Sequence, residues 1–323
     1  MKRIFLAVLL LLTAAAAAGC GGAGSLARQG VPVKWVTDAS GQSMEVPRRP
    51  VRVVSVSYGA DEILLGLIAP DRIKGLSRYA GDEGISFVTA EELARTGGRN
   101  PGNLDSLAAA RPDLVIVSSE TPDEVTDTLR DMGIPVYRSL NPKNWQDVEQ
   151  RIRGISSAVS EEARGEEMIR RMEEKRNAVE KVLSALPPDQ EKRVMALSFS
   201  TVVGKKGTVL ADILRLAHVQ NCGASLTVPE GETVVTKEAV VQADPDVLLL
   251  PTWNFNGHMD AGHFQYEVMH DPAYASVKAV REGRAVFLAD RYRYVTSQHI
   301  ADSVEAAARA VYPELFEREE TQG

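Results

Sequence analysis

Residues 110–118 read ARPDLVIVS, and residues 243–251 read ADPDVLLLP. Each copy places Ala, one variable residue, Pro and Asp before a run of branched apolar residues. Proline cannot continue a helix interior, and it biases the preceding residue away from helical backbone. A short apolar run after such a break is typical of a strand buried on both faces, as in a parallel sheet. Two copies therefore predict two similar α/β halves.

The surroundings of these two stretches repeat as well. A predicted strand at 52–56 leads into an apolar helix at 60–68, and a predicted strand at 194–198 leads into a helix at 208–217. Glu62 and Asp212 hold the same place in these two helices. The strand-to-helix unit is thus written twice, with an acidic residue in each copy.

The segment between the halves has a helical pattern. Apolar residues recur at helical spacing from Val148 to Leu186, and Pro187 and Pro188 follow. Ser160, followed by two acids, is the expected N-cap of a second helix, with a bend at that point. A helix of about 25 residues would span roughly 37 Å. We expect a rigid spacer rather than a flexible linker.

Composition excludes some classes of function. The chain has 323 residues, a net charge of −7 and 25% charged residues. These values are normal for a soluble globular protein of about two domains. No basic stripe is present, which argues against a nucleic-acid partner.

The first residues predict a secretory signal. Lys2 and Arg3 precede an apolar run from Ile4 to Ala18, and Gly19 and Cys20 follow. Cys20 after Ala-Ala-Gly resembles a bacterial lipobox, which implies cleavage of residues 1–19 and lipidation of Cys20. Residues 20–32 would then form a flexible tether. The alternative is an ordinary signal peptide with a chance cysteine.

Only one other cysteine, Cys222, is present. Lipidation of Cys20 would leave no partner for an internal disulfide, although the predicted compartment is oxidising. A lone cysteine is more often a small buried apolar side chain than a reactive thiol.

The chain resembles the substrate-binding lipoproteins of ABC importers that handle iron–siderophores, haem and corrinoids, the class III or helical-backbone group. The resemblance is carried by VTDASGQSMEVPRRPVRVVSVSYGADEILLGLIAPDRIKGLSRYA (36–80), AARPDLVIVS (109–118) and AVREGRAVFLADRYRYVTSQHIADSVEAAARAVYPELF (279–316). It implies an α/β fold with two Rossmann-like lobes, at 33–143 and 189–323, joined by bridging helices at 144–188. The ligand would lie in the cleft between the lobes.

The resemblance also implies partners. Such a protein is extracytoplasmic, is held at the membrane by its lipid, and delivers its ligand to a permease dimer. In this family each lobe offers a carboxylate on its outer surface to arginines of the permease, and Glu62 and Asp212 match those positions. The alternative is that both acids merely favour the start of a helix.

Ligand-binding residues are expected in the loops after strand ends, because ligands of open α/β sheets bind there. Aromatic residues are few, at 6%, yet they gather in these loops together with arginines. Such side chains suit a large, flat or chelated anionic ligand. The candidates are Tyr58, Arg78, Tyr79, Phe199, Trp253, Phe255, His258, His263, Tyr292 and Arg293.

Several alternatives remain open at the level of sequence. A ferric siderophore ranks first as the ligand, and haem or a corrinoid follows, with a histidine or tyrosine as a possible axial ligand. A binder of free Zn or Mn would need more ligands than His258 and His263, whose spacing fits a loop. An enzyme or metallocluster scaffold with paired lobes is a different class. We expect no enzyme activity and no cofactor, because no nucleophile–base arrangement or cysteine cluster is evident.

Overall fold

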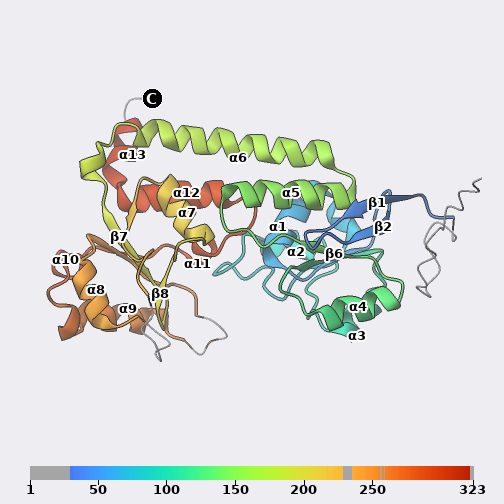
Figure 1. Cartoon of the computed structure of the whole chain (residues 1–323), viewed down its shortest axis with the longest axis horizontal. Coiled ribbons are helices and arrows are strands. Elements are labelled where there is room, and N and C mark those ends of the chain that lie inside the picture. The colour runs from blue at the N-terminus through green and yellow to red at the C-terminus, as the bar shows by residue number, and fades with distance from the viewer. Residues whose placement is uncertain (1–29, 228–234, 255–256, 258, 321–323) are drawn as a thin grey trace, which may run out of the picture.

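The computed structural model describes residues 30–227, 235–254, 257 and 259–320 (Figure 1). The predicted signal, Cys20, Phe255 and His258 lie outside these residues. Two α/β lobes lie side by side beneath a long helix, α6 (Glu162–Leu183) (Figure 1). The predicted fold class is confirmed.

The N-terminal lobe is built on a four-stranded parallel sheet. Its order is β4 (Ile73–Gly75), β3 (Val53–Ser55), β5 (Leu114–Ser118) and β6 (Val136–Ser139). Its helices are α1 (Tyr58–Leu67), α2 (Ala90–Ala94), α3 (Leu104–Ala109) and α4 (Asp123–Asp131). A hairpin of β1 (Val33–Thr37) and β2 (Ser43–Pro47) precedes it.

The C-terminal lobe repeats the design with shorter strands. The order β11 (Ala285–Val286), β10 (Val247–Leu249), β7 (Arg193–Leu197) is parallel, and β8 (Val202–Val203) is antiparallel to β7. β9 (Gln220–Asn221) pairs with β7 in parallel. The helices are α7 (Val209–Leu216), α8 (Lys237–Ala243), α9 (Ala261–His270), α10 (Lys278–Arg281), α11 (Asp290–Arg293), α12 (Ile300–Val311) and α13 (Pro313–Glu320).

The two Pro-Asp stretches do the same structural work. The carboxylate of Asp113 accepts hydrogen bonds from the backbone N–H groups of Val51 (2.8 Å) and Arg52 (2.9 Å), where the chain enters β3. The carboxylate of Asp246 accepts one from the backbone N–H of Arg193 (2.8 Å), the first residue of β7. Each Asp therefore holds the start of a neighbouring strand: the two residues before β3 in one lobe and the first residue of β7 in the other.

The residue before each proline turns the chain. Arg111 and Asp244 have φ of 45° and 40°, the left-handed region that side chains other than glycine seldom adopt. In each copy a helix ends, the chain reverses through this residue, and the Pro-Asp pair starts a buried strand. The repeated Pro-Asp sequence thus forms the same turn in both lobes.

The bridge is a pair of helices. α5 (Trp145–Val159) and α6 pack against each other, and α6 also packs along α12. The predicted N-cap role of Ser160 is wrong: Ser160 ends α5 in the left-handed conformation (φ 60°), and the chain reverses there instead of bending. α6 has 22 residues, about 33 Å of helix.

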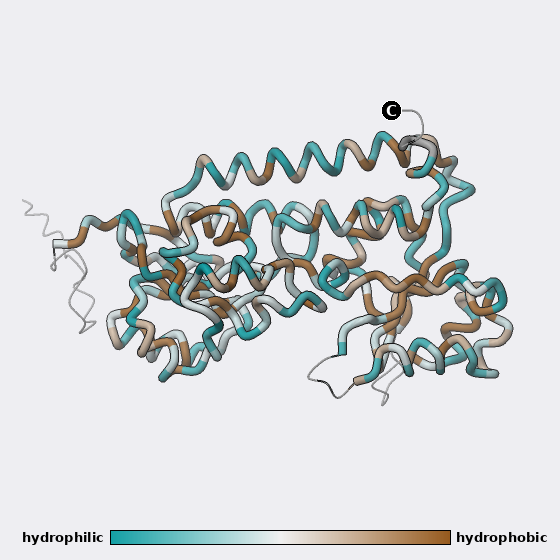
Figure 2. Tube along the Cα trace, turned by 180° about the vertical axis from the view of Figure 1, so that it is seen from behind, coloured by the Kyte–Doolittle hydropathy of each residue, from teal (hydrophilic) through white to brown (hydrophobic). Residues whose placement is uncertain are grey.

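One hydrophobic core runs through both lobes and the bridge. It joins residues of the sheets of both lobes to buried residues of α5, α6 and α12. α6 buries Ile169, Met172, Val179 and Leu183, while hydrophilic residues cover much of its outer face (Figure 2). A shared core of this kind makes the bridge stiff.

No helix in the described residues is long and apolar enough to cross a membrane.

Candidate functional site

Three aromatic side chains from strand-end loops form a chain of rings between the lobes. Tyr58 opens α1 after β3, Tyr79 follows β4, and Trp253 follows β10 of the other lobe. The ring centroids of Tyr58 and Tyr79 lie 6.1 Å apart, and those of Tyr79 and Trp253 lie 6.0 Å apart, both edge to face. The structure thus brings together three of the predicted residues across the lobe boundary.

A positive charge lies beside these rings. The guanidinium of Arg78 sits 4.8 Å from the centroid of the Tyr79 ring, and its Nη2 donates a hydrogen bond of 2.7 Å to the Tyr79 hydroxyl. Arg78 is exposed. An exposed guanidinium has five N–H donors, so most of them remain available to an anionic group.

Trp253 reaches from the C-terminal lobe into a seat on the N-terminal lobe. Its indole Nε1 donates a hydrogen bond of 3.0 Å to Oδ2 of Asp82. A Cβ on Gly84 would lie 2.1 Å from Cδ1 of the indole, so no other residue fits there unless the ring moves. The backbone N–H of Arg291 also donates to the carbonyl of Gly84 (3.0 Å).

The loop that carries Trp253 is held by a buried ion pair. Oδ2 of Asp290 accepts hydrogen bonds from the backbone N–H groups of Thr252 (2.7 Å) and Trp253 (2.8 Å). The other oxygen, Oδ1, lies 3.0 Å from the guanidinium of Arg293, and both side chains are buried. Arg293, a predicted ligand-binding residue, therefore positions the Trp253 loop.

A cavity of about 330 Å³ lies beside Tyr58 at the lobe boundary. Its C-terminal-lobe walls are residues 202–205, 208–210 and 293–296. The Tyr58 hydroxyl donates a hydrogen bond of 2.7 Å to the carbonyl of Tyr294. Burial raises the pKa of Tyr58 to about 12, so this hydroxyl keeps its proton at neutral pH.

A second, larger hollow of about 720 Å³ belongs to the C-terminal lobe alone. The ring of Phe199 lies 5.2 Å from that of Phe264, and both line this hollow together with residues of α8 and α9. Phe199 follows β7, as predicted, but it is not part of the ring chain that starts at Tyr58.

Buried polar groups lie behind the ring chain, where the lobes touch. The carboxylate of Glu62 accepts hydrogen bonds from the backbone N–H of Phe87 (2.9 Å) and from Ser297 Oγ (2.5 Å). Phe87 belongs to the N-terminal lobe, and Ser297 to the segment before α12. Glu62 therefore ties the two lobes together.

The neighbouring groups of Glu62 are buried as well. Arg151 of α5 donates to Ser57 Oγ (2.7 Å) and to the carbonyl of Thr296 (3.2 Å). Burial lowers the pKa of Arg151 to about 10, and it raises the pKa of Asp61 to about 8. Burial also raises the pKa of Glu62. This cluster favours fewer charges than the same residues would carry in water.

The structure contradicts the outer-surface position expected for Glu62. Its side chain is 3% exposed and its oxygens are engaged inside the protein, so it is not offered to a partner. Asp212 accepts a hydrogen bond from the backbone N–H of Trp145 (2.9 Å) and pairs with Arg215 (2.7 Å). A docking role for Asp212 stays a prediction.

The other predicted residues lie apart from the ring chain. The expected loop at 291–294 is largely the short helix α11, and its Tyr292 packs edge to face on Phe87 (5.1 Å). His263 was expected in a loop, but it lies on α9, is exposed, and pairs with Glu267 (3.2 Å). Phe255 and His258 remain predictions outside the described residues.

Sequence reasoning missed Asp82, Gly84 and Asp290. Asp82 and Gly84 lie in a stretch that reads only as a loop, and nothing in the sequence pairs them with Trp253. Asp290 lies two residues before the predicted Tyr292, yet its burial was not foreseen. A tryptophan in a strand-end loop was the available signal, since a buried indole N–H usually finds an acceptor.

Possible metal ligands are dispersed. In the part of the chain that the structure describes, no three His, Cys, Asp or Glu side chains gather into a group that could hold a metal ion. Burial raises the pKa of the Cys222 thiol to about 11, which disfavours a reactive thiolate.

The chain is similar to known proteins over most of its length. A family model described as periplasmic binding protein matches residues 53–292. An uncharacterized ABC transporter substrate-binding lipoprotein of Bacillus subtilis is 24% identical, covering 98% of this chain and 99% of the relative. The molybdate-binding protein MolA of Haemophilus influenzae is 24% identical, covering 91% and 89%. The structure of a periplasmic haem-binding protein from Roseiflexus sp. RS-1 aligns with a TM-score of 0.66 at 20% identity, covering 82% of this chain and 98% of that one.

Proposed function

The chain belongs to the periplasmic binding protein family, and on this premise we propose that it captures an iron–siderophore-type ligand between its lobes for an ABC importer. The ligand would lie against Tyr58, Tyr79 and Trp253 and would then be handed to the permease dimer. The protein would work outside the cytoplasm, held at the membrane by a lipid on Cys20.

One observation carries the ligand class: the chain of rings with Arg78 beside it. Flat or chelated ligands bind against apolar faces with a few oriented polar groups. Arg78 can pair with a carboxylate or another anionic group on such a ligand. The rings come from both lobes, so a ligand lying on them would contact both lobes at once.

The size of the cavity favours a second candidate. About 330 Å³ lies at the small end of small-molecule sites. A ferric siderophore, haem or a corrinoid would each need the lobe boundary beside Tyr58 to open further, whereas a small oxyanion would not. One relative is named as a molybdate-binding protein, so a small oxyanion complex is the alternative, with haem and corrinoids next.

A titration panel tests the proposal. The panel consists of ferric siderophores, haemin, cobalamin and molybdate, each followed by calorimetry and by tryptophan fluorescence. We expect a ferric siderophore to bind and to quench the emission of Trp253, so Trp253→Phe removes the quenching. Trp35→Phe is the matched control, because Trp35 lies on the hairpin far from the rings. Binding of haemin or molybdate alone would contradict the siderophore assignment and would leave the importer role standing.

A further inference from the structure

We propose that the outer face of the β1–β2 hairpin is a membrane-contact surface that rests on the anionic headgroups of the lipid bilayer. The surface consists of Trp35 on β1 and of the exposed residues Val31, Arg48, Arg49 and Val51 that directly flank the hairpin strands, and we call it the hairpin face. The inference rests on the proposed extracytoplasmic, anchored location, and it adds a surface that ligand binding does not explain.

Exposed apolar side chains are concentrated on the hairpin face. Among the described residues, seven large hydrophobic side chains are exposed, and three of them, Val31, Trp35 and Val51, fall within 21 residues of one another. Trp35 is 67% exposed, more than any of the other six. Tryptophan is enriched at membrane–water interfaces, because its apolar ring and polar N–H suit the headgroup depth.

Two cations stand beside these apolar groups. Arg48 and Arg49 are exposed, and no hydrogen-bond or ion-pair partner is recorded for either side chain among the described residues. The backbone N–H of Arg48 donates to the carbonyl of Pro32 (2.8 Å), which places this pair next to Val31. Glu45 lies opposite Trp35 in the hairpin register, so the two arginines leave the hairpin face with a net charge of about +1 on a protein that carries −7 as a whole. That is the charge an anionic bilayer attracts.

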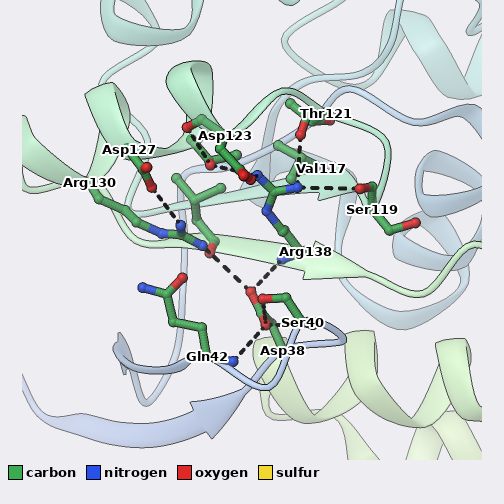
Figure 3. A network of polar contacts seen from close by, with 12 residues as sticks. Asp38, Ser40, Gln42, Val117, Ser119, Thr121, Asp123, Asp127, Arg130 and Arg138 are labelled. Carbon is green, nitrogen blue, oxygen red and sulfur yellow. Dashed lines mark hydrogen bonds and ion pairs between the residues drawn. The ribbon is translucent and has the colours of Figure 1, made fainter.

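The hairpin face is held rigidly. On the inner side, Val36 and Val46 enter the main core, and Nζ of Lys34 donates to Glu162 (3.2 Å) at the start of α6. At the hairpin turn, Asp38 accepts a hydrogen bond from the backbone N–H of Arg138 (3.3 Å) and pairs with Arg130 (3.6 Å) (Figure 3). The hairpin is therefore already ordered in the free protein, so membrane binding carries no entropy cost for ordering it.

The position along the chain decides between a membrane and other partners. Nine residues, 21–29, or ten Cα–Cα steps, separate the predicted lipid site at Cys20 from the first described residue, Gly30. Fully extended, they reach about 35 Å, and a Gly-rich chain of this length averages roughly 18 Å end to end. Trp35 lies five residues after Gly30, in β1. A bilayer surface is thus the partner that the anchor itself keeps within reach of the hairpin face.

Vesicle experiments separate the hairpin face from the anchor. The mature chain carries a hexahistidine tag in place of Cys20 and is held on vesicles by a nickel-chelating lipid, so lipidation is not needed. The vesicles contain phosphatidylcholine alone or with about 30% phosphatidylglycerol, with or without brominated acyl chains. The emission of Trp35 is the difference between the wild-type protein and Trp35→Phe.

We expect the Trp35 emission to shift to the blue and to be quenched by brominated lipid, most strongly with phosphatidylglycerol. Arg48→Gln with Arg49→Gln should weaken the binding of the untethered protein to anionic vesicles by roughly five-fold for each arginine. Tyr266→Ser, at a 62% exposed aromatic residue on α9, is the control and should change nothing.

An unshifted, unquenched Trp35 overturns the proposal. If Trp35→Ser then lowers transport by the assembled importer, the hairpin face contacts the permease instead. If it abolishes a dimer, the partner is a second copy of the chain. Ligand titration with the same preparations, read through Trp253, tests the proposed function separately.

Discussion

The indole N–H of Trp253 and the carboxylate of Asp82 form a 3.0 Å hydrogen bond that joins the loop after β10 to the loop after β4. These residues are 171 positions apart in the chain. Their bond is one contact between the lobes, and the bond between Ser297 and Glu62 is a second. A ligand that lies on the aromatic rings would contact Trp253 directly.

Gly84→Ala should displace the Trp253 ring from its contact with Gly84 and Asp82. The added Cβ would lie 2.1 Å from the ring, so the ring has to move and the bond to Asp82 breaks. We expect a loss of about 1–3 kcal/mol in the free energy of unfolding, as for overpacked cores, and a red shift of the Trp253 emission. Gly262→Ala is the control, because its nearest neighbouring atom lies at 3.4 Å. An unshifted emission in Gly84→Ala would show that the Trp253 ring does not pack against Gly84 in solution.

Arg78→Ala should weaken the binding of an anionic ligand without changing stability. A hydrogen bond to a charged group contributes about 1.5–3 kcal/mol, which corresponds to roughly 10- to 150-fold in Kd. Arg78→Lys keeps the charge but loses the planar donor fork, so we expect an intermediate Kd. Calorimetry gives both values. An equal Kd for all three proteins would exclude Arg78 from the site.

Asp61→Asn should change how stability depends on pH. Burial raises the folded pKa of Asp61 from 3.8 to about 8, so the folded protein holds a proton that the unfolded chain releases. The stability from this proton is complete below pH 3.8 and falls as the pH rises to about 8, by up to roughly 1.4 kcal/mol per pH unit. Asparagine has no such proton to lose.

Urea unfolding at several pH values measures this difference. We expect Asp61→Asn to gain on the wild-type protein steadily between pH 5 and pH 8. A difference that stays constant over this range would mean that Asp61 titrates near its ordinary pKa. Asp105→Asn, at an exposed residue, controls for removal of one surface charge.

Asp113→Asn and Asp246→Asn should each destabilise the lobe to which the residue belongs. Each carboxylate accepts hydrogen bonds from backbone N–H groups at the start of the neighbouring strand, and an amide keeps one acceptor oxygen at most. A lost bond of this kind costs about 1–3 kcal/mol. Asp113 accepts two such bonds, and Asp246 accepts one and also pairs with Lys278 (2.6 Å), so we expect losses of similar size. Chemical denaturation measures both, and equal stability in all proteins would refute the shared role.

The sequence predicts the architecture well, because the rules involved are local. Pro-Asp followed by a branched apolar run defines β5 and β10, and the repeat of that unit defines two lobes. The same rule, that binding residues follow strand ends, places Tyr58, Tyr79 and Trp253 correctly beside the lobe boundary. The three rings come close together because the loops at the carboxyl ends of the strands in the two lobes face each other.

Other features could not be predicted, because they depend on packing across the lobes. An acid in the first turns of a helix is favourable whether it is exposed or buried. The sequence around Glu62 therefore does not indicate that its side chain is only 3% exposed. Ser160 followed by two acids is typical of an N-cap, yet the chain reverses there in the left-handed conformation. Arg293 was expected in an open loop, but it is buried in an ion pair with Asp290 at the wall of the 330 Å³ cavity, and its ligand contact stays a prediction.

Hydrogen exchange with and without the ligand found by the panel tests the central claim most directly. If the ligand lies between the lobes, bound protein should show slower amide exchange at residues 77–84 of one lobe and at 250–254 of the other, together. Protection confined to 198–202 and 264–274, around the hollow of the C-terminal lobe, would contradict a site between the lobes.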